Sequence, residues 1–182
     1  LLQYSFDAAT GGVAPLEPAN ASPPEGTGPR HLAFHPTLPV VYFSNEQHLG
    51  VSVYDRDAAG RLKFRAVCDA LTADEPNQGV SSSDIVITPD GRYLFAGIRG
   101  HQQSFDFITR YRIGDDGGVT LIGRTPADKI PWGFTLSPGG EYLFVTAYTG
   151  ATLTAYKVGK DGSLEKAASL PCDKDISDIV AR

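Results

Sequence analysis

The chain has 182 residues, a formal net charge of −5, and lysines and arginines scattered along its length. A mild negative charge without a basic cluster argues against nucleic acid or a membrane surface as its main partner, and no apolar run is long enough for a transmembrane helix. Its 20 glycines and 13 prolines favour an all-β fold with many tight turns.

The two cysteines, Cys68 and Cys172, lack the spacing of a metal site and have no nearby partner cysteine. We expect them to be free or buried thiols, and the prediction that follows is a reducing, cytoplasmic location. No signal peptide is visible. Because the sequence begins at Leu1 rather than Met, we expect the natural start to lie outside it.

Residues 1–7 read as a strand, and a second strand follows the turn at Gly11-Gly12. The proline-rich stretch at residues 15–29 is expected to be a loop. The same two-strand ending closes each later repeat, so residues 1–18 are expected to be the end of a partial blade.

After this loop a unit recurs that consists of a short apolar strand, a turn containing proline, and a second strand. The turn prolines are Pro36, Pro89 and Pro138, which are 53 and 49 residues apart. A period near fifty with this content is typical of a β-propeller blade.

Each unit continues with an alternating strand, a glycine-containing turn and a fourth strand. The sequence therefore predicts four-stranded antiparallel blades at about residues 30–70, 82–126 and 131–171. A further partial blade is expected at residues 175–182, because Ser177-Asp178-Ile179-Val180 copies Ser83-Asp84-Ile85-Val86.

We interpret residues 1–182 as a single all-β propeller domain with three complete blades and partial blades at both ends. A propeller has to close, because an open end exposes apolar surface. We therefore expect a fragment of a longer protein whose missing N-terminal part completes the ring. Two alternatives stay open, namely a small ring closed by pairing of the two ends and a ring made from two copies.

The first strand of a blade lines the central channel and the second runs antiparallel beside it. The start of the first strand and the end of the second therefore meet at one mouth of the channel. These positions hold ionisable and aromatic side chains, which are Arg30, His31, Glu46, Asp84, Arg99, Trp132 and Tyr148. The pattern predicts a concave site at this rim.

Several of these residues lie in motifs that resemble the lactonase family of seven-bladed propellers. The motifs are Gly28-Pro29-Arg30-His31, Asn45-Glu46, Ser83-Asp84-Ile85, Thr88-Pro89-Asp90-Gly91-Arg92 and Arg99. The family includes bacterial propeller-type 6-phosphogluconolactonases and fungal 3-carboxy-cis,cis-muconate lactonizing enzymes. The resemblance covers nearly the whole chain, corresponds to the C-terminal half of the ring, and implies an active site containing Arg30, His31, Glu46 and Arg99.

The expected activity is hydrolysis of an anionic sugar-acid lactone such as 6-phosphogluconolactone, without a metal or cofactor. Such a reaction needs a base to activate water and a cation to hold the carbonyl oxygen as charge develops on it. Glu46 is the candidate base or proton carrier, His31 can donate a proton to the leaving alkoxide, and Arg99 can support the oxyanion. Two arginines around one carboxylate would instead make Glu46 a weaker base and a better anchor.

A second set of residues is expected to bind the small anionic substrate: Arg30, Asn45, Asp84, Trp132 and Tyr148. Arg30 and Arg99 can hold a phosphate or carboxylate through paired hydrogen bonds. The chain departs from the family pattern at Trp132, where members often carry Arg, and at Val86, where some carry His. These departures keep two alternatives open, a carboxymuconate lactonizing (cycloisomerase) activity and a non-catalytic propeller that binds a ligand or protein.

Each candidate also has a purely structural interpretation. Asp84 can bond backbone amides of a neighbouring blade, and Arg30 with Glu46 can form an ion pair between blades. His35 is expected to pack or cap its turn, and His48 and His101 to be polar surface residues. Asp55-Arg56-Asp57 and Asp115-Asp116-Gly117-Gly118 lack the full spacing of a calcium loop, so turn chemistry explains them better.

Overall fold

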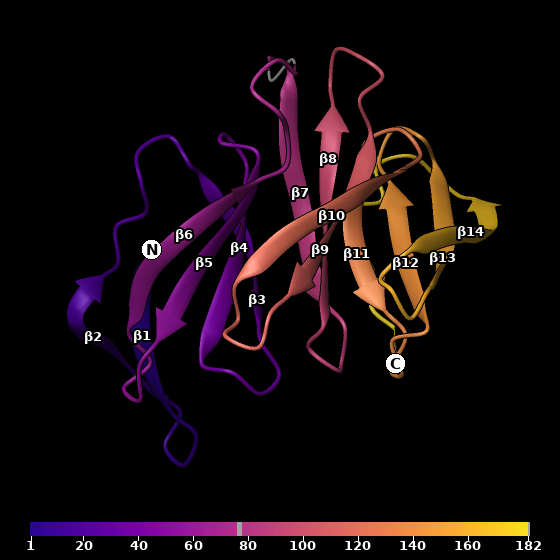
Figure 1. Cartoon of the computed structure of the whole chain (residues 1–182). Helices are drawn as coiled ribbons and strands as arrows, with labels where there is room; N and C mark the ends of the chain where they lie inside the picture. Colours follow the sequence, from indigo (N-terminus) through magenta and orange to yellow (C-terminus); the bar gives the residue numbers. More distant parts are fainter. Residues whose placement is uncertain (76–77, 182) are drawn as a thin grey trace.

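The computed structural model describes residues 1–75 and 78–181, and these residues form only strands and their connections (Figure 1). The first sheet pairs β1 (Leu2–Asp7) with β2 (Gly12–Asn20). The three four-stranded sheets comprise β3 (Pro29–Phe34), β4 (Val40–Asn45), β5 (Gly50–Arg56) and β6 (Leu62–Asp69); β7 (Val80–Ile87), β8 (Tyr93–Gly100), β9 (Phe107–Ile113) and β10 (Val119–Pro126); and β11 (Pro131–Leu136), β12 (Tyr142–Ala147), β13 (Thr152–Val158) and β14 (Leu164–Pro171).

Each four-stranded sheet is an antiparallel meander in which consecutive strands pair. The sheets stand side by side in chain order (Figure 1), and their first strands adjoin, β3 against β7 and β7 against β11. This arrangement confirms the predicted all-β fold of four-stranded propeller blades, with β3, β7 and β11 as the inner strands.

Tight turns of one blade are buried against the preceding blade. Gly91 closes the turn before β8 with φ +72°, and its N–H donates to the Thr88 carbonyl at 2.8 Å. The imidazole of His35 lies against this turn, where its Nε2 donates to the Gly91 carbonyl at 3.1 Å while its Nδ1 accepts from Leu38 N at 2.9 Å. A side chain at Gly91 would contact the His35 ring at 2.6 Å, so only glycine fits. His35 thus both caps its own turn and packs on the next blade.

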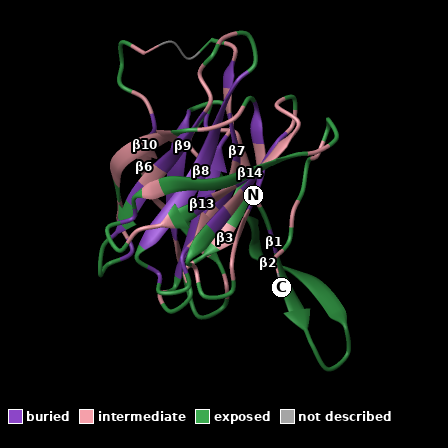
Figure 2. Cartoon of the chain, turned by 90° about the vertical axis from the view of Figure 1, so that its right-hand side faces the viewer, coloured by how far each residue is buried: buried purple, intermediate pink, exposed green. Residues whose placement is uncertain are grey.

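The hydrophobic core lies between successive sheets, and its buried strands occupy the centre of the molecule (Figure 2). One cluster joins Tyr42 and Val53 to Leu94 and Tyr111, and a second joins Phe95 of the middle blade to the third blade. A tyrosine hydroxyl adds a hydrogen bond across the first of these interfaces, where Tyr42 Oη donates to the Gly117 carbonyl at 2.8 Å. The stacked blades therefore hold their inner strands in a fixed relation.

Two segments differ from the sequence-based expectation. Strand β2 continues to Asn20 through a stretch predicted to be a loop, and Pro15 pairs with Tyr4 there. Proline is tolerated because β2 is an edge strand whose outer side needs no N–H donor. The sequence predicts a further partial blade at residues 175–182, of which residue 182 lies outside the described residues. Residues 175–181 form no strand, and Ala181 N donates to Thr135 Oγ1 of β11 at 3.3 Å.

An apolar surface remains open beside β1 and β3. A pocket of about 540 Å³ lies there, and Leu2, Phe6, Leu32 and Phe34 are all exposed in its lining. How the ring closes over this surface stays a prediction. Among the described residues, none belongs to a helix of the length and hydrophobicity that a membrane crossing requires.

Candidate functional site

Each inner strand carries a β-bulge at the positions that the sequence pattern singled out. Residues 30–31 of β3 oppose Ser44 alone, residues 83–84 of β7 oppose Gly97 alone, and residues 132–133 of β11 oppose a single residue of β12. An extra residue bends a strand and re-aims its side chains. The bulges therefore turn neighbouring side chains of each inner strand in new directions.

Small residues on the second strands hold these bulges in place. Ser44 Oγ donates to the Ser83 carbonyl at 2.8 Å and accepts from His31 N at 3.3 Å. Thr146 Oγ1 plays the corresponding part in the third blade by accepting from Gly133 N at 2.9 Å. The middle blade has Gly97 at this position, where any side chain would collide with the Ser83 hydroxyl.

The first group of candidate residues is a guanidinium cluster around Glu46. Arg99 Nη2 donates to Glu46 Oε1 at 2.8 Å and to the Ser82 carbonyl at 2.6 Å. Arg30 Nε lies 3.7 Å from the same carboxylate oxygen. Arg99 is buried, whereas the Glu46 side chain is 46% exposed. Two cations thus share one carboxylate, which leaves the cluster with an excess positive charge.

Trp132 stacks on both guanidinium groups of this cluster. Its ring centroid lies 4.3 Å from Arg99 Cζ and 5.2 Å from Arg30 Cζ, within the range of cation–π attraction. Tyr148 packs on Trp132 with ring centroids 4.8 Å apart. Burial, followed by the neighbouring charge of Arg30, lowers the pKa of Arg99 from its usual value. The indole therefore covers cations that have lost part of their hydration.

The second group pairs His31 with Asp84. His31 Nδ1 lies 2.7 Å from Asp84 Oδ1, and that oxygen also accepts from Ile85 N at 2.8 Å. Asp84 Oδ2 accepts from Phe134 N of the next blade at 2.9 Å. Asp84 thus bonds a neighbouring amide, as its structural interpretation expects, and also holds an imidazole.

The structure brings most of the expected residues into these two groups, which adjoin along the inner strands. Ser82, which accepts from Arg99, precedes Asp84 by two residues, and Trp132 precedes Phe134 by two residues. Asn45 belongs to neither group through a hydrogen bond among the described residues, because its Oδ1 accepts from Ser52 Oγ at 2.9 Å within the blade. The Ser82 carbonyl and the Phe134 amide were not foreseen, since backbone groups leave no signal in residue type.

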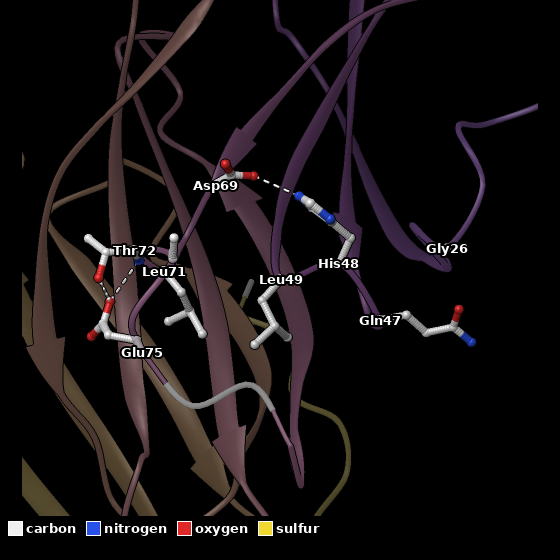
Figure 3. Close-up of a pocket in the computed structure, with 9 residues that line it drawn as sticks. Gly26, Gln47, His48, Leu49, Asp69, Leu71, Thr72 and Glu75 are labelled. Atoms are coloured by element: carbon white, nitrogen blue, oxygen red, sulfur yellow. Dashed lines mark hydrogen bonds and ion pairs between the residues drawn. The ribbon is translucent and has the colours of Figure 1, made fainter.

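A separate pocket of about 360 Å³ lies near the end of β6 (Figure 3). His48 Nε2 pairs there with Asp69 Oδ1 at 2.7 Å, and Glu75 accepts from Thr72 N at 2.8 Å. His101 bonds Ser81 Oγ at 2.7 Å through Nε2. Within residues 1–75 and 78–181, no three His, Cys, Asp or Glu side chains converge as metal ligands.

A family model and curated relatives both match this chain to lactonase-type propellers. The family model described as "Lactonase, 7-bladed beta-propeller" matches residues 1–174. A 6-phosphogluconolactonase from Cronobacter sakazakii is 32% identical over 157 residues, which are 85% of this chain and 46% of the relative. The chain therefore spans about half the length of the curated relatives that it matches.

Two solved structures share the fold. A protein from Bacteroides fragilis superposes with a TM-score of 0.84 at 24% identity, over 97% of this chain and 50% of that one. A periplasmic gluconolactonase from Pseudomonas aeruginosa gives a TM-score of 0.83 at 24% identity, over 96% of this chain and 48% of that one. At this level of identity the likeness concerns the architecture alone.

Proposed function

This chain belongs to the lactonase family of seven-bladed β-propellers, and from that premise we propose that it hydrolyses an anionic sugar-acid lactone such as 6-phosphogluconolactone. The 32% identity to a 6-phosphogluconolactonase supports this substrate class. The observation that carries the proposal is the cluster in which Arg30 and Arg99 share the single carboxylate of Glu46.

The excess positive charge of this cluster suits an anionic substrate. Arg99 Nε and Arg30 Nη1 are buried and have no hydrogen-bond partner among the described residues. Buried donors without acceptors are unfavourable, and a phosphate or carboxylate entering the cluster could satisfy them after a small shift. The same guanidinium groups would stabilise negative charge on the carbonyl oxygen when water attacks.

Two groups can move protons beside this anion site. Glu46 is the half-exposed carboxylate of the cluster, and His31 is an exposed imidazole on the adjacent bulge. Trp132 and Tyr148 form an aromatic wall on which a sugar ring can stack. The proposal therefore assigns binding to the arginines and the aromatic pair, and proton transfer to Glu46 and His31.

The test is an assay of the full protein on 6-phosphogluconolactone, with rates compared to the uncatalysed reaction. Removal of one oxyanion donor typically lowers kcat about 10²–10³-fold, which is the loss expected for Arg99→Ala. The matched control is Arg112→Ala, since Arg112 is an exposed arginine on β9 outside the cluster. A wild-type rate equal to the uncatalysed one, or an Arg99→Ala variant as active as wild type, would reject the proposal.

The carboxymuconate reaction is the competing activity within the family. It would use the same cations, so product analysis with 6-phosphogluconolactone and 3-carboxy-cis,cis-muconate in parallel separates the two. The cytoplasmic location belongs to this proposal too, and the free thiols Cys68 and Cys172 support it. Fractionation of cells that express the full protein tests the location.

A further inference from the structure

The pair formed by His31 and Asp84 has a defined proton arrangement. The two atoms that face each other are Nδ1 and Oδ1, 2.7 Å apart. An ionised carboxylate can only accept hydrogen bonds, so the proton between them belongs to Nδ1. A neutral imidazole with its proton on Nδ1 carries its lone pair on Nε2. The carboxylate thus determines which nitrogen of His31 is basic.

Asp84 is itself firmly placed. Its Oδ1 accepts from Ile85 N, and its Oδ2 accepts from Phe134 N of the neighbouring blade. Its side chain is only 15% exposed, while that of His31 is 44% exposed. The buried end of the pair is therefore fixed by backbone groups, and the imidazole is the end that solvent or a ligand can reach. His31 Nε2 has no hydrogen-bond partner within residues 1–75 and 78–181.

Glu46 is placed differently. Its Oε1 accepts from Arg99 at 2.8 Å and has Arg30 Nε at 3.7 Å. That oxygen is therefore engaged by a charge-assisted hydrogen bond to a buried guanidinium group. The imidazole, by contrast, has its Nδ1 bonded to Asp84 Oδ1 and leaves Nε2 without a hydrogen-bond partner within residues 1–75 and 78–181.

We propose that Asp84 is a positioning residue that orients His31 with Nε2 as its basic nitrogen, and that His31 rather than Glu46 takes up and returns the proton in lactone hydrolysis. This inference rests on the proposed function, which assigned proton transfer to Glu46 and His31 together, and it gives that role to His31 alone. Glu46 then serves as the anchor that holds Arg30 and Arg99 in place.

The proton balance of the step is complete without another reactant. Water attacks the lactone carbonyl carbon, and one of its protons passes to His31 Nε2 as the new C–O bond forms. The tetrahedral intermediate collapses with cleavage of the ring C–O bond, and the leaving alkoxide takes the proton from Nε2. The products are the open hydroxy acid, which releases its carboxyl proton to solvent, and the neutral imidazole with its original tautomer.

The bulges explain how the pair and the cluster can serve one substrate. Arg30 and His31 are consecutive residues of the β3 bulge, and Arg99 bonds Ser82 two residues before Asp84. The inference therefore assigns the anion and the carbonyl oxygen to the arginines, and the attacking water to Nε2 of the residue that follows Arg30.

Imidazole ¹⁵N NMR on the full protein, labelled at histidine, tests the positioning without reference to activity. In wild type, the His31 signal should show a protonated Nδ1 and an unprotonated Nε2 at a pH where the ring is neutral. In Asp84→Asn the fraction of this tautomer should fall. The opposite tautomer in wild type would overturn the inference, whatever the enzyme's substrate.

Kinetics on 6-phosphogluconolactone test the catalytic part. General acid–base groups contribute about 10²–10⁴-fold, so Asp84→Asn and His31→Gln should each lower kcat within that range and change KM less than threefold. The double variant should be no slower than His31→Gln, because the two residues act as a unit. The control is Asp178→Asn at the repeat-equivalent position, where the carboxylate accepts from Ile179 N and has no histidine partner within the described residues.

The outcomes distinguish a failure of this inference from a failure of the proposed function. If the wild-type protein hydrolyses the lactone but Asp84→Asn or His31→Gln keeps full kcat, the inference is wrong and the proposed lactone hydrolysis stands. A wild-type protein with the expected tautomer but no activity on any lactone would refute the proposed function and leave only the orienting contact. Thermal unfolding of each variant shows whether a loss of kcat reflects misfolding, and His31→Gln, which keeps all contacts of Asp84 to backbone, serves as the second probe.

Discussion

The carboxylate of Glu46 should be a measurable contributor to stability, and Glu46→Gln isolates its charge. Glutamine keeps the size of the side chain and an oxygen that can accept from Arg99. Loss of one partner from a fully buried ion pair is destabilising by about 3–5 kcal/mol, whereas exposed pairs contribute about 0–1 kcal/mol. Here the Arg99 side chain is 2% exposed and that of Glu46 is 46% exposed, so the contribution of this pair should lie between these limits.

Other contacts reduce the expected effect further. Arg99 keeps its hydrogen bond to the Ser82 carbonyl and its stacking on Trp132 in the variant. We therefore expect Glu46→Gln to lower the free energy of unfolding by about 2 kcal/mol, equivalent to a fall in Tm of about 4–8 °C for a protein of this size.

Urea unfolding of wild type and Glu46→Gln measures this difference directly. A double-mutant cycle with Arg99→Gln then shows whether the loss arises from this pair, because the coupling energy should account for most of it. The control is Glu165→Gln, since Glu165 is exposed on β14 and has no ion-pair partner among the described residues. A destabilisation by Glu46→Gln no larger than that of the control, or a coupling energy near zero, would show that the Glu46–Arg99 pair does not contribute to the free energy of unfolding.

Three further predictions concern other contacts. Trp132→Ala should raise KM for 6-phosphogluconolactone about tenfold, since it removes cation–π stacking of about 1.4 kcal/mol from both guanidinium groups. Trp132→Phe should restore part of the substrate affinity. Steady-state assays measure KM, and equal values for the wild type and Trp132→Ala would contradict this prediction. The Arg124 guanidinium lowers the pKa of Glu75 from 4.5 to about 2, so the pair stabilises the folded state above pH 4.5 and this contribution is lost as the pH falls through 2. Denaturation curves at several pH values should therefore show a smaller decline from pH 4.5 to 2 in Glu75→Gln, and identical pH profiles would disprove the assignment. Gly91→Ala should lower the free energy of unfolding by at least about 1–2 kcal/mol, because an alanine is strained in the left-handed backbone conformation, and the clash with His35 should add to this loss. Adding His35→Ala should remove only the part due to the clash, and unfolding of the double variant measures how much stability returns.

The repeat itself could be predicted because its signals are local. The proline and glycine at Pro89 and Gly91 favour a turn through their own backbone preferences, and three proline-containing turns about fifty residues apart indicate blades. The loop predicted at residues 15–29 is wrong only at residues 15–20, which continue β2, and the reason is the opposite one. Whether Pro15 breaks a strand depends on whether another strand needs its N–H, and that is decided by the sheet as a whole.

The grouping of the site residues could be predicted only in part. The repeat spacing placed Arg30, Trp132 and Arg99 at one rim, because each lies at the start of a first strand or at the end of a second strand, and the structure brings them into contact. The same spacing could not show that His31 faces Asp84 while its neighbour faces Glu46. That division depends on the bulges, which are irregularities of strand pairing and are not specified by residue type.

The bulges also explain why binding and proton transfer can be assigned to different residues in so small a space. In a regular strand, Arg30 and His31 would point to opposite faces of the sheet and could not serve one ligand. With one extra residue opposite Ser44, the guanidinium reaches the carboxylate of Glu46, just beyond the second strand, while the imidazole reaches across to the next blade. The equivalent bulge of the third blade places Trp132 over the arginines and presents Phe134 N to Asp84. Each of the three inner strands thus contributes to both groups, so any change that straightens one bulge should disturb anion binding and the orientation of His31 together.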